Sequence, residues 1–224
     1  MRNGFLALAL LSMSAAVYAQ TPQAPTTQPP AATPQAAPRP ASPAGAAQTQ
    51  VAGSYVKDEK GREQYRNGKW IEITYGRPLK RGRDVFGSGA SYGTTLLAGA
   101  PIWRAGANQA TQLITEVPLT IGGKTVPAGR YNLYIELKSP TEWTLVVSSW
   151  GAKKTGNDPT PDTLWGGYNY TPDKDVARAP MTVSKTQASI DQLTWGFADV
   201  TAESGKMFLA WDTTHAMVSF TVAK

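Results

Sequence analysis

From residue 71 onward, apolar and polar residues alternate with a period of two, and this pattern constrains the fold more than any other feature of the chain. Successive side chains of a strand point to opposite faces of a sheet, so each run offers one face to a core. The apolar positions are Ile71, Ile73, Tyr75; Tyr131, Leu133, Ile135, Leu137; Trp143, Leu145, Val147; Leu193, Trp195, Phe197; Met207, Leu209, Trp211; and Ala216, Val218, Phe220, Val222. Each run predicts a short strand.

Glycine and proline separate these runs, as expected for tight turns. The pair Gly122-Gly123 predicts a hairpin turn, and Pro127-Ala128-Gly129 predicts a second turn before the strand at Tyr131. Helix signals are absent except between Asp58 and Gln64, where Gly61 weakens even a single turn. About eight strands with short connections predict an all-β fold, an antiparallel β-sandwich in one domain over residues 53–224.

The start of the chain predicts export. Arg2, the apolar stretch from Phe5 to Ala16 and the small-residue pattern Val17-Tyr18-Ala19 are typical of a signal peptide over residues 1–19. The alternative is a membrane anchor, but a spanning helix needs about 20 apolar residues and this run is shorter. We therefore expect a periplasmic or extracellular protein with no membrane span after cleavage.

Residues 20–52 predict a disordered linker. They are mainly Ala, Pro, Gln and Thr, with Arg39 as the one charge, and carry too little apolar surface to offset the entropy of ordering. Repeated prolines favour extended conformations, which gives a semi-stiff spacer. The alternative is a proline-rich ligand for a partner protein, but no repeated charged proline motif is present.

The composition excludes several kinds of catalytic site. The chain has no cysteine, which excludes thiol nucleophiles and disulfides, and one histidine, His215, which excludes a His-rich zinc site. Nothing near His215 resembles a nucleophile elbow, so we expect a surface histidine there. We expect no catalytic residue, no metal and no cofactor. No sequence feature indicates an oligomeric state.

The formal net charge of +6 favours anionic partners. Long-range attraction would promote encounters with envelope polymers, lipid surfaces or acidic ligands, without selecting one of them. A protein that reads nucleic acid would carry its basic residues as a stripe on a recognisable module. We therefore expect no nucleic-acid partner.

A loop region rich in cations offers the most specific candidate site. Arg forks suit carboxylate and phosphate, so several converging arginines could hold an anion. We predict a site for an anionic small molecule or an envelope glycan at Arg77, Arg81, Arg83, Trp103, Arg104 and Asn108. The alternative is structural: Arg104 and Asn108 bond to backbone carbonyls of the loops, while Lys80 and Arg81 stay solvated.

The seven tryptophans raise a carbohydrate-binding interpretation, because sugar rings stack on exposed indoles. Trp143, Trp195 and Trp211 lie on the apolar faces of their strands, which predicts core packing. A sugar platform would therefore use the aromatic residues of loops and strand ends. These residues are Trp103, Trp150, Trp165, Tyr92, Tyr168 and Tyr170.

Several segments together resemble the domain-of-unknown-function 2911 family of exported bacterial proteins. They are Gly76-Arg77-Pro78, Trp103 to Asn108, Ile121 to Lys124, Pro127 to Tyr131, Trp165-Gly166 and Asp175 to Arg178. The resemblance runs from about Ile71 to the C-terminus and implies an envelope setting with no established activity. Gln109 stands where we expect a Glu in this family, which puts a carboxylate role at that position in doubt.

These observations favour a non-catalytic binding or structural protein of the envelope. The alternative is a hydrolase that acts on envelope glycan through a carboxylate pair, for which Glu72 and Glu136 are candidates on polar strand faces. The segments 157–162 and 173–175 carry oxygen ligands that suit Ca²⁺, although turn-forming Asp explains both as well.

Overall fold

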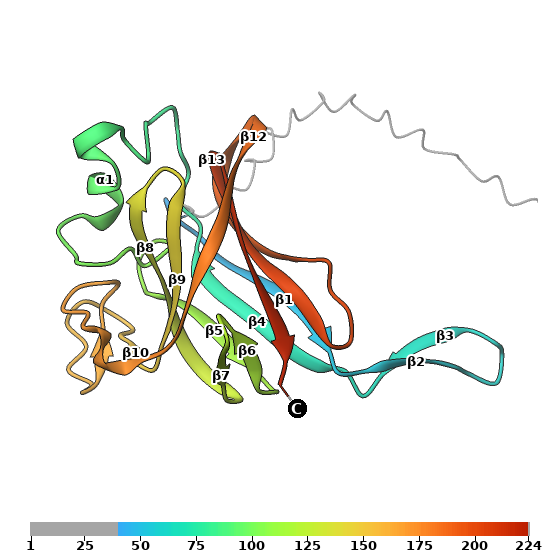
Figure 1. Cartoon of the computed structure of the whole chain (residues 1–224). Helices are drawn as coiled ribbons and strands as arrows, with labels where there is room; N and C mark the ends of the chain where they lie inside the picture. Colours follow the sequence, from blue (N-terminus) through green and yellow to red (C-terminus); the bar gives the residue numbers. More distant parts are fainter. Residues whose placement is uncertain (1–39, 224) are drawn as a thin grey trace, which may run out of the picture. The chain divides into compact units, whose positions relative to one another are not determined.

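The computed structural model describes residues 40–223, which are mostly β structure (Figure 1). Nine strands form the main sheet: β1 (Ala44–Val51), β4 (Lys69–Gly76), β5 (Thr111–Thr115), β6 (Leu119–Ile121), β7 (Lys124–Val126), β8 (Gly129–Ser139), β9 (Glu142–Ser148), β12 (Asp175–Ala198) and β13 (Ser204–Val222). Two short pairs lie outside it: β2 (Ser54–Lys57) with β3 (Glu63–Arg66), and β10 (Gly151–Ala152) with β11 (Thr163–Leu164). The predicted all-β class is confirmed.

The main sheet has the order β1-β4-β5-β8-β9-β12-β13-β6-β7, and neighbouring strands are antiparallel throughout. β12 joins its two halves, because it pairs first with β9 and then with β13. The second part of β12 returns over β4, where the Leu193 N–H donates to the Pro78 carbonyl at 3.0 Å. Figure 1 shows β12 and β13 crossing β1 and β4. One folded sheet therefore supplies both layers of the sandwich.

The core lies between these two layers. Ile71, Ile73 and Leu113 face inward from one layer, and Leu209 and Phe220 face inward from the other. The three tryptophans predicted to be in the core, Trp143, Trp195 and Trp211, are all buried. The period-two pattern therefore identified the inner face of the sheet correctly.

The last two predicted strands are a single strand, β13. Its buried residues change phase between Trp211 and Ala216, and Asp212 between them has a positive φ of 52°. The pairing with β12 is irregular over the same region, between Lys185 and Thr194. An irregularity of this kind bends a strand without ending it, which explains why the sequence reads as two strands.

The predicted linker boundary is wrong. Ala44–Val51, which we expected to be disordered, is strand β1 and pairs in full register with β4. Its small residues Ala47 and Val51 pack against the core, and the free edge of β4 supplies backbone partners that composition does not reveal. Residues 1–39 lie outside the described residues, and with them the predicted signal peptide and the first part of the linker.

The helical turn considered between Asp58 and Gln64 is also wrong. Asp58 accepts the N–H groups of Lys60 and Arg62 at 2.9 Å and closes the turn of the β2–β3 hairpin instead. Short helices occur elsewhere, at α1 (Thr94–Leu97) and two 3₁₀ turns (Gly89–Ser91 and Pro172–Lys174). The turn at Gly122-Gly123 is confirmed, with φ of 58° and 74° between β6 and β7. Within residues 40–223, no helix is long and apolar enough to cross a membrane.

Candidate functional site

Two arginines of the cation-rich loop region bind backbone carbonyls. The Arg83 guanidinium donates to the Leu79 carbonyl at 2.6 Å and to the Lys80 carbonyl at 3.0 Å. The Arg104 guanidinium donates to the Asn108 carbonyl at 2.6 Å, and burial lowers the pKa of its side chain. The Arg104 contact matches the structural alternative considered for this region, which did not include Arg83. Lys80, which that alternative expected to stay solvated, instead forms a salt bridge with Asp212.

These two arginines border one small pocket together with Trp103. Its volume is about 140 Å³, and Asp84 contributes to its wall. Trp103 is 2% exposed and packs edge to face on Trp143 in the core, so most of its indole is unavailable to a ligand. Arg83, Trp103 and Arg104 therefore do lie together, in a pocket with little room.

The other predicted site residues lie elsewhere. The Arg77 side chain covers Gly45 of β1, and its Nε is buried without a hydrogen-bond partner among the described residues. The Arg81 backbone N–H donates to Asp191 Oδ1 at 3.0 Å, while its side chain is exposed. Asn108 borders a different and larger groove. The six predicted residues therefore do not form one site.

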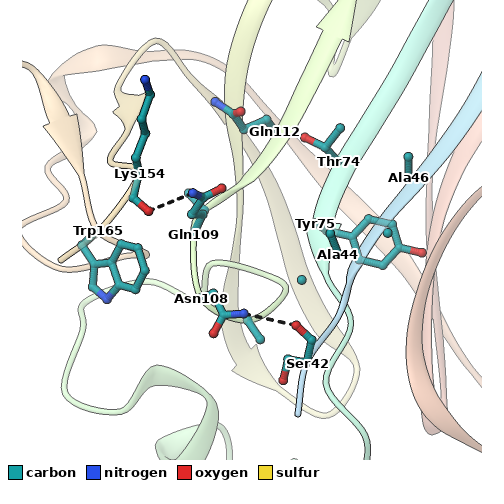
Figure 2. A pocket seen from close by; sticks show the side chains of 14 residues that line it. Ser42, Ala44, Ala46, Thr74, Tyr75, Asn108, Gln109, Gln112, Lys154 and Trp165 are labelled. Carbon is teal, nitrogen blue, oxygen red and sulfur yellow. Dashed lines mark hydrogen bonds between the residues drawn. The ribbon is translucent and has the colours of Figure 1, made fainter. Parts of the chain in front are cut away.

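The larger groove lies on the outer face of the sheet, over β1, β4 and β5 (Figure 2). Its volume is about 570 Å³. Its lining consists mainly of amides, hydroxyls, small residues and one indole: Ser42, Ala44, Gly45, Ala46, Thr74, Tyr75, Gly76, Ala107, Asn108, Gln109, Ala110, Gln112, Lys154 and Trp165.

Strand register forms the floor of this groove. Ile73 and Tyr75 point to the core, so Thr74 between them points outward. Thr74 pairs with Ala46 on one side and with Gln112 on the other, which places a hydroxyl and an amide side by side. The sheet therefore presents a row of uncharged polar groups at this level.

Three of the segments that resemble the family form the end of the groove. Gly76 ends β4 directly below the loop that carries Ala107, and a Cβ on Gly76 would collide with the Ala107 carbonyl oxygen. Gly166 has a positive φ of 60° and lies against the Arg104 guanidinium. The loops after Trp103 and Trp165 are thus fixed to each other and to the sheet.

Side-chain amides attach these loops to the chain on either side, as Figure 2 shows. Asn108 Nδ2 donates to the Ser42 carbonyl at 3.2 Å, and Gln109 Nε2 donates to the Lys154 carbonyl at 2.9 Å. A Glu in place of Gln109 has no N–H to donate to that carbonyl. Gln109, which stands where the family resemblance leads us to expect a Glu, therefore has a structural role in fixing this loop.

A second pocket of about 340 Å³ shares Gln109, Gln112 and Lys154 with the groove, so the two adjoin, and we call them together the combined groove. Arg130 lines the added part and donates to Gln112 Oε1 at 3.0 Å. Trp150 forms its far wall, where the indole N–H donates to the Thr171 carbonyl at 3.1 Å.

The charge of this combined groove is positive. Of the described residues that line its two pockets, none is an acid or a histidine, whereas Lys154 and Arg130 are cations. The Asp158 carboxylate holds the backbone of Lys154 in place from outside the groove. Hydrogen bonds from Thr160 and Lys154 lower the pKa of Asp158 to about 2. The groove thus suits a neutral or anionic polar ligand.

The carboxylates proposed for a hydrolase do not form a pair. Ile114 on β5 pairs with Glu72 on β4 and with Arg130 on β8, so Glu72 and Arg130 lie at the same level of the sheet. Glu136 lies six residues after Arg130 on β8. At the strand rise this is a separation of about 20 Å. Glu136 instead accepts a hydrogen bond from Arg178 at 2.6 Å, and Asp175 binds the same guanidinium at 2.8 Å.

The cluster around Asp175 is occupied by internal contacts. Tyr170 donates to Asp175 Oδ2 at 2.7 Å, and burial together with this carboxylate raises the pKa of Tyr170. Burial also raises the pKa of Tyr134 to about 12. The segment 173–175 thus contributes its aspartate to an internal network. Within residues 40–223, no three His, Asp or Glu side chains are placed to hold a metal ion.

Sequence reasoning missed the outer face of the sheet. Thr74 and Gln112 occupy the polar phase of their strands, and Trp70 does the same on β4, with its side chain 47% exposed. The period of two that located the core could have located these residues, because they are the alternate positions. No sequence pattern could have located Lys154 in the groove, because its position depends on the fold of the long loop between β10 and β11.

A family model described as "Protein of unknown function (DUF2911)" matches residues 58–220. This range covers more than half of the chain and includes β3 to β12 and most of β13. No curated protein and no solved structure matches the chain.

Proposed function

The chain belongs to the DUF2911 family, and because the description of that family names no activity, we propose a function from the groove itself. We propose that the protein is exported and that its β domain is a non-catalytic module that binds a neutral or anionic glycan of the bacterial envelope. The signal-like residues 1–19 support the export part of this proposal.

The observation that carries the proposal is the chemistry of the groove lining. A sugar needs donors and acceptors for its hydroxyls and an apolar face for its ring. Thr74, Asn108 and Gln112 supply the polar groups, and Trp165 supplies an aromatic surface beside them. Lys154 adds one cation for an acidic substituent, and no acid among the described lining residues would repel that substituent.

The geometry also favours binding over hydrolysis. Glycoside hydrolysis needs two carboxyl groups on either side of the scissile bond, about 5 to 10 Å apart. Among the described residues, the lining of the combined groove has no carboxylate, so the sugar units held between Trp165 and Trp150 meet no such pair. We expect these units to leave the groove unchanged.

A thermal-shift screen tests the proposal. The domain from residue 40 onward, which keeps β1, is heated with neutral amino-sugar oligosaccharides and with oligosaccharides that contain uronic acids. A ligand that binds only the folded state raises the melting temperature. We expect a rise in melting temperature for at least one of these two ligand classes. Trp165→Ala should weaken the affinity for that ligand at least tenfold.

The matched control is Tyr168→Ala, which removes an exposed aromatic ring outside the groove. This variant should bind like the unchanged protein, and circular dichroism checks the fold of both. A shift that persists in Trp165→Ala, or no shift with either ligand class, contradicts the proposal. Release of shortened oligosaccharides during the incubation contradicts the non-catalytic assignment.

A further inference from the structure

The open face that carries the groove continues along the strands toward Trp70. Outward positions repeat every second residue, so Thr74 on β4 is followed by Glu72 and then by Trp70. The same rule takes β5 from Gln112 to Ile114 and then to Glu116 beside Trp70. The distance from Thr74 to Trp70 along the strand is about 13 Å.

Trp70 is the most exposed of the tryptophans in the range 40–223, with 47% of its surface accessible. It borders a pocket of about 260 Å³ with Gln48, Glu72, Ile114 and Glu116. It also borders a pocket of about 430 Å³ at the base of the β2–β3 hairpin, where Tyr55 and Tyr65 pack edge to face. The indole is thus available to a ligand from two sides.

The two carboxylates beside Trp70 have no cationic partner among the residues that the structure describes. Glu116 is fixed next to the indole, because its Oε2 accepts the Trp70 backbone N–H at 2.8 Å. Neither Glu72 nor Glu116 forms a salt bridge with any residue in the range 40–223. Arg130 lies nearby on β8 but directs its guanidinium to Gln112.

An exposed indole flanked by two unpaired carboxylates favours a cation. The face of Trp attracts an ammonium group, and two neighbouring negative charges add to that attraction. The Trp165 end of the same face has the opposite character, with amides and Lys154 in its lining. The two ends therefore select different groups of one extended ligand.

We propose that the Trp70 end is a second subsite that takes the protonated amine of an amino sugar in the chain bound at Trp165. This inference rests on the proposed function, because the two ends then hold one glycan. The ligand class is an oligosaccharide of several units that includes a sugar with a free amine, since a single sugar would not span the face.

Calorimetric titration with two matched tetrasaccharides tests the subsite. One is the N-acetylglucosamine tetramer, and the other is the same tetramer with the acetyl group removed from one terminal sugar only, so that the other three sugars still suit the Trp165 end. We expect the free-amine tetramer to bind about tenfold more tightly at pH 6 and low salt. The double variant Glu72→Gln, Glu116→Gln should lose this preference and keep its affinity for the acetylated tetramer.

Glu142→Gln removes one exposed carboxylate at the β8–β9 turn, at the opposite end of β8 from the strand ends that carry Trp70 and Glu116, and is the control for net charge. It should keep the preference. Equal binding of the two tetramers by the unchanged protein overturns the amine subsite and leaves the glycan groove standing. A preference that survives in the double variant also overturns the subsite. Failure of both tetramers to bind overturns the subsite, and the screen with uronic-acid ligands then decides the groove separately.

Discussion

The loops from Arg77 to Arg104 and the outer face of β1, β4 and β5 use polar side chains in opposite ways. In the loops, Arg83 and Arg104 are bonded to backbone carbonyls. On the outer face, Glu72 and Glu116 have no ionic partner among the described residues. The cations that stand out in the sequence mostly hold the loops, whereas the inconspicuous face keeps groups free for a ligand.

Long loops need this use of arginine. Their carbonyl groups have no neighbouring strand to pair with, and a buried carbonyl without a donor is costly. A guanidinium supplies up to five donors from one side chain. The outer face has no such need, since the strands already satisfy the backbone.

The junction of the two regions, at Gly76, should give the largest effect. Gly76→Val places side-chain atoms against the Ala107 carbonyl and forces the loop away from β4. Overpacking of this kind costs about 3 kcal/mol. Urea denaturation should show this loss, and the groove end should no longer bind a glycan. Full stability in Gly76→Val would mean that the loop is not held against the sheet.

Arg104→Ala should destabilise the domain by about 2 kcal/mol, because the Asn108 carbonyl loses a charged donor. Arg104→Lys should recover only part of this loss, since an ammonium cannot reproduce the fork. Denaturation measures stability, and glycan titration below the melting point should show little change in affinity. A lost affinity with unchanged stability would instead make Arg104 a ligand contact.

The Lys80–Asp212 pair should give a smaller effect that depends on pH. Burial raises the pKa of Asp212, but hydrogen bonds from Lys80 and Ser189 outweigh it, so the pKa is lowered overall. A carboxylate whose pKa is lower in the folded than in the unfolded state stabilises the protein at any pH above the unfolded-state pKa of about 3.9. This stabilisation is lost as the pH falls through the folded-state pKa. Asp212→Asn should cost about 1 kcal/mol at pH 7.

The cost of Asp212→Asn should shrink below pH 4 as the carboxylate of the unchanged protein takes up a proton. Denaturation curves at several pH values for both proteins give the comparison. A difference that stays constant from pH 7 to pH 2 would show that Asp212 acts by packing, not by its charge.

Arg81→Ala should give the smallest effect. The contact that fixes this residue uses its backbone N–H, which the substitution keeps, and its side chain is exposed. The change in stability should stay within about 0.5 kcal/mol. A larger loss in thermal denaturation, or a loss of glycan affinity, would give the Arg81 side chain a role that the loop geometry does not assign to it.

The sequence predicted the inner face of the sheet well, because the burial of Ile71, Ile73 and Trp195 follows from strand periodicity alone. It did not predict β1, because Ala44–Val51 has few large apolar residues and becomes ordered through pairing with β4. The groove escaped prediction for a similar reason. Gln112 and Lys154 meet only because a loop far along the chain folds back over the sheet.

The most direct test of the account is a map of amide chemical shifts by nuclear magnetic resonance during titration with the glycan found in the screen. The account predicts shifts that concentrate on Thr74, Gln112 and Lys154 and at the Trp165 indole. Shifts concentrated at Arg83 and Arg104, with the outer face unchanged, would contradict it and return the ligand site to the loops.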